Sequence, residues 1–197
     1  APSALAAREA TLLPGPSPFA PWEQDSVRPT SFTSGLRLDL HFVRESDFGR
    51  LHAAVRMVLP LLPALSASTP FRDGRATGLH SARLRACVDL YDRHPERVGA
   101  FVPEPVFDPN DHDREVLGPI ARAMGSSKRG DSQDPQALNL RSATAHLDQG
   151  IISIHGIDAQ ENAAADMAVI EFTIAVLRAL VAGRWVSNYL QRAWSSE

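Results

Sequence analysis

Residues 142–157 read SATAHLDQGIISIHGI, and this stretch decides the fold. Two runs suited to strands, residues 142–147 and 151–157, are separated by Asp148-Gln149-Gly150. Three polar or glycine residues between two such runs are typical of a tight hairpin connection. The sequence therefore predicts two neighbouring antiparallel strands here.

A third strand is predicted at residues 36–42, which read LRLDLHF. Leucine alternates with Arg37, Asp39 and His41 through this run. Side chains alternate between the two faces of a strand, so one face should be buried and the other polar.

Helices should fill most of the remaining chain. Apolar residues recur at helical spacing in residues 46–65, 81–91 and 111–124, and in a long stretch from Ala163 that continues past Gly183 to Trp194. Ser46 and either Asp111 or Asp113 are the expected N-caps, and Pro60 and Pro63 should kink or end the first helix. Strands and helices do not alternate as βαβ units. The expected fold class is α+β, with an antiparallel sheet packed against several helices.

The first 35 residues differ in composition from the rest. They hold six of the 15 prolines, at positions 2, 14, 16, 18, 21 and 29. Such a segment cannot bury enough apolar surface to fold alone. We expect a Pro-rich arm at residues 1–35, lying on its own domain or on a partner, and a folded domain at residues 36–197.

Composition narrows the class of protein. The 197-residue chain is 44% hydrophobic and 22% charged, with a net charge of −3, which gives no reason to expect a nucleic acid or an anionic membrane as partner. Residues 163–183 are apolar, but Asp166, Glu171 and Arg178 interrupt them, so we expect a buried helix rather than a membrane span. Cys87 is the single cysteine, which fits a cytoplasmic protein.

Three motifs occur in order along the domain. Residues 59–71 read LPLLPALSASTPF and are followed by a Gly-Arg-x-Thr-Gly turn at residues 74–78; residues 102–107 read VPEPVF; and residues 138–141 read LNLR, followed by the hairpin and DAQE at residues 158–161. With their spacing, these motifs resemble the C-terminal half of the ATP-dependent glutamate–cysteine ligases and related carboxylate–amine ligases.

The resemblance implies half of a glutamine-synthetase-like fold. It also implies formation of a γ-glutamyl-type amide bond through an acyl phosphate, with ATP and Mg²⁺ as cofactors. Acidic residues would hold the metal on the phosphates, and basic groups would neutralise the transferring phosphoryl group. If the ligase function does not hold, no cofactor is expected.

The chain departs from the family pattern in two ways. Family chains are about twice as long, and the other half carries an acidic strand that supplies metal ligands. Ser153 and His155 stand where the family has Glu-x-Arg, and Arg37 and Asp39 stand where it has His-x-Asn. We therefore expect the isolated chain to be inactive, and we identify no metal ligand in it.

Five residues are candidates for binding substrate or phosphate: Arg75, Thr77, Arg83, Asn139 and Arg141. Arg75 is the strongest, because an arginine on a glycine-flanked loop can present its guanidinium to a phosphate or carboxylate. Its alternative role is a surface ion pair. For Asn139 the alternative is a hydrogen bond to loop backbone.

Asp39 and His155 are the candidate catalytic residues. Alternation predicts them on one face of the sheet, and a His–Asp pair suits proton transfer. The alternative is a hydrogen-bonded remnant of a lost site.

Three hypotheses follow for the whole chain. It is one subunit of a split ligase whose second chain supplies the metal-binding half, or an inactive homologue that serves regulation or assembly, or an enzyme with new chemistry at Asp39 and His155. The first two require a second protein subunit or a homo-oligomer, and a small amino acid is the expected substrate type.

Overall fold

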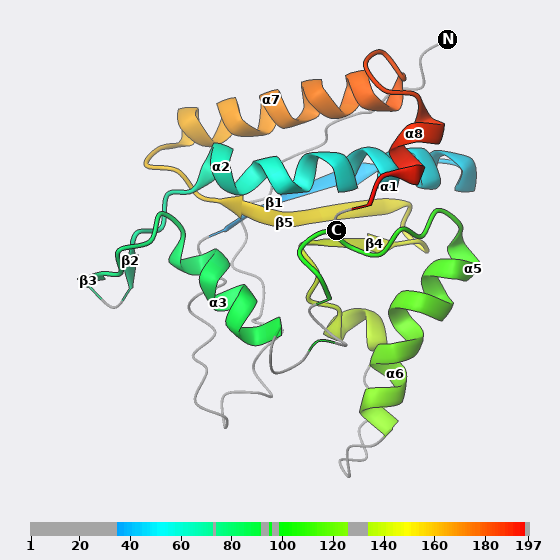
Figure 1. Ribbon diagram of the computed structural model, residues 1–197, viewed down its shortest axis with the longest axis horizontal. Coiled ribbons are helices and arrows are strands. Elements are labelled where there is room, and N and C mark those ends of the chain that lie inside the picture. Colours follow the sequence, from blue (N-terminus) through cyan, green and yellow to red (C-terminus); the bar gives the residue numbers. More distant parts are fainter. Residues whose placement is uncertain (1–34, 73, 92–94, 96–98, 126–133, 196–197) are drawn as a thin grey trace.

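The computed structural model describes residues 35–72, 74–91, 95, 99–125 and 134–195 (Figure 1). The predicted Pro-rich arm lies outside the described residues, apart from Gly35, which begins the first strand. The fold is α+β, as predicted, with an antiparallel sheet packed against helices.

The central sheet has three strands in the order β1-β5-β4. They are β1 (Gly35–His41), β4 (Ala143–His146) and β5 (Ile151–Asp158), and both pairings are antiparallel. The predicted hairpin is confirmed as β4–β5. At its turn Gly150 has a φ of 64°, and an added Cβ would lie 2.6 Å from the Phe42 carbonyl oxygen, so this position requires glycine.

One face of this sheet forms one side of the hydrophobic core. The core side chains of the sheet are Leu36, Leu38, Leu40, Ala143, Ala145, Ile152, Ile154 and Ile157. Helices α1 (Glu45–Val58) and α7 (Ala163–Val181) lie on this side (Figure 1). The alternation read from the sequence is therefore confirmed for β1.

A β-bulge interrupts the β1–β5 pairing. Leu38 pairs with Ile154 but Leu36 pairs with Ile157, so β5 has one residue more than β1 over this interval. The extra residue returns Ile157 to the core face after Ile154.

The first helix continues through two short segments. After α1 come the 3₁₀ turn η3 (Leu59–Leu61) and α2 (Leu62–Ser66), and Pro60 and Pro63 each occupy an early position where a missing N–H is tolerated. The whole stretch Glu45–Ser66 is long and apolar enough to cross a membrane by length and composition. Its apolar side chains Phe48, Val55 and Leu59 are fully buried in the core, as in the central helix of a globular domain.

The remaining elements lie around the other face and the ends of the sheet, except α8, which lies on the side of α1 and α7 (Figure 1). They are β2 (Phe71–Arg72), β3 (Arg75–Ala76), α3 (Ala82–Tyr91), α5 (Pro109–His112), the π-helix η4 (Asp113–Leu117), α6 (Gly118–Gly125), η5 (Pro135–Leu138) and α8 (Asn188–Ala193). The predicted helices at residues 81–91 and 111–124 are thus confirmed, whereas the β2–β3 hairpin was not predicted.

The helix boundaries correct two predicted N-caps. The N-cap of α1 is Arg44, without a side-chain bond, rather than Ser46. The N-cap of α5 is Asp108, whose carboxylate accepts from the Asn110 backbone N–H, rather than Asp111 or Asp113. In both cases the helix begins earlier than the apolar period, which does not mark where the chain turns.

The long final helix is also shorter than predicted. It ends at Val181, and Gly183 follows with a φ of 66°, the left-handed conformation that commonly terminates helices. A separate helix, α8, then begins with Ser187 as its N-cap. Gln191 of α8 is fully buried and donates to the carbonyls of Leu180 and Val186, which fixes α8 against the end of α7.

Arg56 ties the loop before α5 and the C-terminal segment to α1. Its Nε donates to the Pro103 carbonyl at 2.9 Å and its Nη1 to the Trp194 carbonyl at 3.3 Å. The guanidinium also lies 5.9 Å from the Phe107 ring centroid and 5.6 Å from that of Trp194. Arg56 therefore holds the VPEPVF motif against α1.

Two glycine substitutions test this packing. An added Cβ at Gly49 on α1 would lie 2.5 Å from the Phe107 carbonyl oxygen, whereas at Gly118 the nearest atom is at 3.4 Å. Gly49→Ala should lower the free energy of unfolding by about 1–3 kcal/mol through overpacking. Gly118→Ala should raise it by up to about 1 kcal/mol through helix propensity. Urea unfolding measures both, and a stabilised Gly49→Ala variant would contradict the close approach.

Candidate functional site

Six polar side chains form a row on the sheet face that is turned away from α1 and α7. We call them the polar row: Arg37 and Asp39 on β1, Ser153 and His155 on β5, and Thr144 and His146 on β4. Pairing places Asp39 opposite Ser153 and Ser153 opposite Thr144, so side chains from all three strands meet on this face.

Asp39 is held from two sides. Its Oδ1 accepts from Arg37 Nε at 2.7 Å and from Ser153 Oγ at 2.6 Å. Burial acts to raise the pKa of the Asp39 carboxyl, but these two hydrogen bonds and the Arg37 charge outweigh it and leave the pKa below its usual value. Asp39 is therefore an ionised carboxylate at neutral pH.

His155 belongs to the other half of the row. Its Nε2 lies 3.0 Å from Thr144 Oγ1, and the same hydroxyl lies 3.4 Å from His146 Nε2. Burial is the main cause that lowers the pKa of His155 to about 4, so this imidazole is neutral at pH 7. Burial also lowers the pKa of His146.

The structure brings the two candidate catalytic residues onto one face, with Ser153 and Thr144 beside them. Among the described side chains, no hydrogen bond joins Asp39 directly to His155, although each influences the pKa of the other. A catalytic role for the pair stays a prediction.

The Arg83 side chain is buried rather than exposed to solvent. It is 7% exposed, and its Nε donates to Asp158 Oδ1 at 2.6 Å, while its Nη1 donates to the His155 carbonyl at 2.9 Å. Asp158 also accepts from Thr69 Oγ1 at 2.9 Å. The ion pair thus fastens α3 and the preceding loop to the end of β5.

Arg141 and Asn139 have a similar buried setting. Arg141 makes a two-pronged ion pair with Glu104, at 2.8 and 2.5 Å, which joins the VPEPVF motif to the start of β4. Arg141 also contacts Asn139 Oδ1 at 3.3 Å. The Nδ2 of Asn139 is buried without a hydrogen-bond partner in the part of the chain that the structure describes.

Arg75 and Thr77 lie on the β2–β3 hairpin and the loop after it, which projects beyond the end of the sheet (Figure 1). The Arg75 side chain is exposed. Thr77 closes the hairpin instead, because its Oγ1 donates to the Pro70 carbonyl at 2.8 Å. The five candidate binding residues are therefore divided among three places: the hairpin, the Arg83–Asp158 pair and the Arg141–Glu104 pair.

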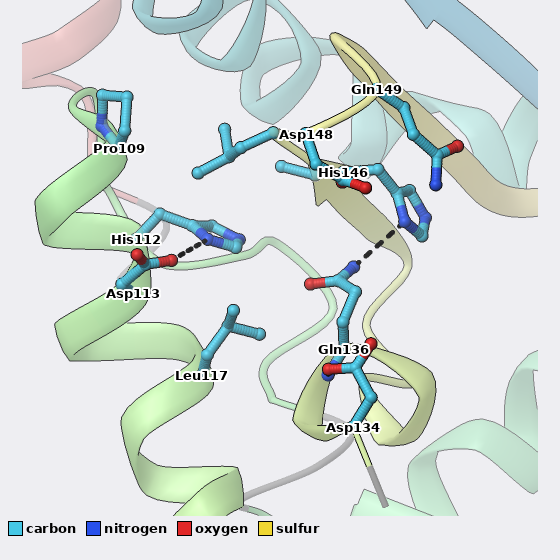
Figure 2. A pocket seen from close by; sticks show the side chains of 11 residues that line it. Pro109, His112, Asp113, Leu117, Asp134, Gln136, His146, Asp148 and Gln149 are labelled. Atoms are coloured by element: carbon cyan, nitrogen blue, oxygen red, sulfur yellow. Dashed lines mark hydrogen bonds and ion pairs between the residues drawn. The ribbon is translucent and has the colours of Figure 1, made fainter.

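Sequence reasoning missed Thr144 and His146. The signal was present, because residues 143–146 alternate Ala-Thr-Ala-His and both polar side chains must share a face of β4. Below His146 lies an open hollow of about 720 Å³, bounded by α5, η4 and the β4–β5 turn (Figure 2).

Two further histidines, His52 and His112, are buried, and His112 lines this hollow. His52 is 4% exposed and contacts the rings of Phe48 and Phe107, which are tilted and edge-on to it with centroids 5.5 and 6.1 Å away. Burial lowers the pKa of His52 to about 3. His112 is 3% exposed, and burial lowers its pKa as well.

The polar row does not by itself fit a magnesium ion. Mg²⁺ prefers oxygen ligands with carboxylates among them. The row holds one carboxylate, that of Asp39, which is already bound to Arg37 and Ser153. Within the described ranges there is no group of three or more His, Cys, Asp or Glu residues arranged to hold a metal.

The buried histidines predict acid sensitivity. In the unfolded chain His52 should titrate near its usual value of 6.5, so the unfolded state binds more protons between pH 6.5 and about 3. Stability should be full above pH 6.5 and fall on acidification by about 1.4 kcal/mol per pH unit for such a histidine. His52→Gln should reduce this slope in urea unfolding at pH 7, 6 and 5. His41→Gln, at an exposed position, should leave it unchanged; equal slopes in all three proteins would contradict the prediction.

The two arginine environments predict opposite outcomes. Arg83→Met leaves Asp158 buried and unpaired, so it should lower the free energy of unfolding by about 3–5 kcal/mol. Arg75→Met removes an exposed side chain and should change it by less than about 0.5 kcal/mol. Urea denaturation at neutral pH measures both changes. Comparable losses of unfolding free energy in the two variants would show that Arg75 also stabilises the fold.

Comparison with known families gives one result. The model of glutamate–cysteine ligase family 2 (GCS2) matches residues 23–192. Comparison with curated proteins found no match. The family match covers most of the chain, including the whole sheet, the polar row and both buried ion pairs. The chain therefore belongs to glutamate–cysteine ligase family 2, whose name denotes an amide-bond-forming ligase.

Proposed function

We propose that the chain is one component of an ATP-dependent carboxylate–amine ligase. The reaction would form a γ-glutamyl-type amide bond through an acyl phosphate, and a second polypeptide would supply the acidic residues that bind Mg²⁺. The chain would work in the cytoplasm, as its single cysteine suggests. The supports are family membership and the polar row.

The polar row carries the proposal. It offers a cation and a carboxylate in one set of hydrogen bonds, and a neutral imidazole in a second set on the same face of the sheet. The Arg37 side chain is 49% exposed and can attract an anionic substrate. Asp39 is ionised and fixed by two donors, so it can hold a substrate ammonium group or accept its proton. His155 is neutral at pH 7, and a neutral imidazole can accept a proton.

The ligands that the row offers support the proposal of a second component. With a single, already bound carboxylate, the row cannot form an oxygen-rich magnesium site. Carboxylates from another polypeptide, either a different protein or a second copy of this chain, would complete it. What this chain contributes is binding of the reacting groups and control of one proton.

A second candidate function has its own observation. The Asp39 carboxylate, the Ser153 and Thr144 hydroxyls and the His155 imidazole already hydrogen-bond within the row. A network satisfied in this way suits a non-catalytic homologue that serves as a regulatory or assembly subunit.

The test uses the chain purified with its native partners. ADP release from ATP and glutamate, dependent on an added amine, should be absent for the isolated chain and present for the complex. In the complex, Asp39→Asn should lower kcat by about 10²–10⁴, the usual contribution of a positioned proton-transfer group. His41→Gln, on the same strand and exposed, is the matched control and should keep full activity.

Three results decide between the proposals. Turnover by the isolated chain would overturn the need for a second component. Full activity of Asp39→Asn in the complex would remove the polar row from the chemistry. An assembled complex that neither binds nor hydrolyses ATP would favour the regulatory subunit.

A further inference from the structure

Helix α7 has an apolar side that the core does not cover. Between residues 167 and 182 the sequence has only two charged residues, Glu171 and Arg178. Side chains on the inner side of the helix are buried in the core, yet Met167 and Phe172 are 45% and 57% exposed. A helix that is apolar all round is normally covered on all sides. The outer side of α7 therefore has the composition of a contact surface.

The exposed residues between positions 167 and 178 share this side of the helix. We call them the outer face: Met167, Ala168, Glu171, Phe172, Ala175 and Arg178. They recur every three or four residues, the spacing that places helical side chains on one face. Figure 1 shows α7 along the outside of the molecule, with α1 on its inner side. The outer face is thus accessible to another molecule.

The two charges of the outer face are placed symmetrically. Glu171 and Arg178 are seven positions apart, about 10 Å along a helix, with Ala175 close to the midpoint. If a second α7 lies antiparallel across a twofold axis at Ala175, Glu171 of each copy faces Arg178 of the other. In a parallel pair, Glu171 would face its own copy and so would Arg178, and like charges repel. The charges therefore favour one partner in one orientation, which is this same helix run antiparallel.

The small side chains of α7 suit the same arrangement. Ala168 and Ala182 are each seven positions from Ala175, so Ala168 of one copy faces Ala182 of the other. Alanine allows two helices to approach to about 8 Å between their axes, the close end of the usual range. Phe172, three positions before Ala175, is then removed from water on both copies, which favours association.

We propose that the outer face of α7 binds a second copy of this chain, with the two α7 helices antiparallel about a twofold axis at Ala175. The same residues contribute from both copies, as in any contact across a twofold axis. The contact requires no ligand and does not depend on the proposed ligase function.

The proposed dimer has a consequence for the polar row. Helix α7 and the polar row lie on opposite faces of the sheet (Figure 1). The two polar rows of the dimer are therefore turned away from the contact, and neither copy reaches the row of the other through α7. If the ligase function holds, the carboxylates that bind Mg²⁺ come from a polypeptide at a different surface.

Sedimentation equilibrium of the full 197-residue chain tests the proposal. Over about 1–200 µM the chain should pass from monomer to dimer, with a dissociation constant in the micromolar range. Glu171→Arg and Arg178→Glu each place like charges at both contacts, so each should weaken the dimer at least about tenfold. An equimolar mixture of the two variants should restore the dimer, because every contact then joins opposite charges again. A restored dimer also shows that both variants are folded.

The matched control uses a second pair of exposed charges with the same spacing. Glu115 on η4 and Arg122 on α6 are also seven positions apart, and they lie away from α7 (Figure 1). Glu115→Arg and Arg122→Glu change the net charge by the same amounts as the two α7 variants. They should leave the dissociation constant of the dimer unchanged.

Four results would overturn the proposal. A chain that stays monomeric up to about 200 µM lacks the contact. Equal weakening by the control variants would mean that net charge, and not the outer face, governs association. A mixture of the two α7 variants that stays monomeric would contradict the antiparallel pairing. A monomeric chain that loses a co-purifying protein on Arg178→Glu would show that the outer face binds a different protein.

The dimer and the ligase function can fail separately. Sedimentation reports the contact through α7 whether or not the assembled complex makes an amide. Conversely, an active complex built on a monomeric chain would retain the ligase function and remove the dimer.

Discussion

Strand β5 forms hydrogen bonds with a strand on each side and contributes side chains to both faces of the sheet. The rest of the structure depends on these contacts. Strand β5 pairs with β1 on one side and β4 on the other. Its Ile152, Ile154 and Ile157 lie in the core, while Ser153 and His155 join the polar row. The bulge near its end is the adjustment that keeps Ile157 in the core and leaves Asp158 to receive Arg83. A shift of one residue would exchange the faces and remove both the core and the row.

Local patterns in the sequence were enough for the sheet and most helices. Alternation in residues 36–42 and 151–157 placed Asp39 and His155 on one face, and the Asp148-Gln149-Gly150 turn fixed the hairpin. The sequence could not reveal the roles of Arg83 and Arg141, because their partners Asp158 and Glu104 are 75 and 37 positions away in the chain. Helix starts were missed for a related reason: capping depends on how the chain enters a helix, and not on the apolar period.

The arginines of this chain have two roles: some are buried and join distant segments, and others are exposed. Arg56, Arg83 and Arg141 are buried, and each joins segments that are far apart in sequence. A planar guanidinium suits this purpose, since its several donors can reach a carboxylate and backbone carbonyls together. Arg37 and Arg75 are exposed and remain accessible to a ligand. A sequence motif does not distinguish these two kinds of arginine. Their burial does, because the buried arginines hold segments together and the exposed ones present a charge to solvent.

The pairing of β5 on both sides also determines how readily its backbone amides exchange with solvent. Its amides are hydrogen-bonded within the sheet and covered by the core, so native-state hydrogen exchange there should require near-global unfolding. The β2–β3 hairpin, with two residues in each strand, needs only a local opening. Ser153 and His155 thus stand on backbone that should exchange slowly, and Arg75 on backbone that should exchange faster. A ligand that contacts both Arg75 and the polar row would therefore join a short exposed hairpin to the doubly paired central strand.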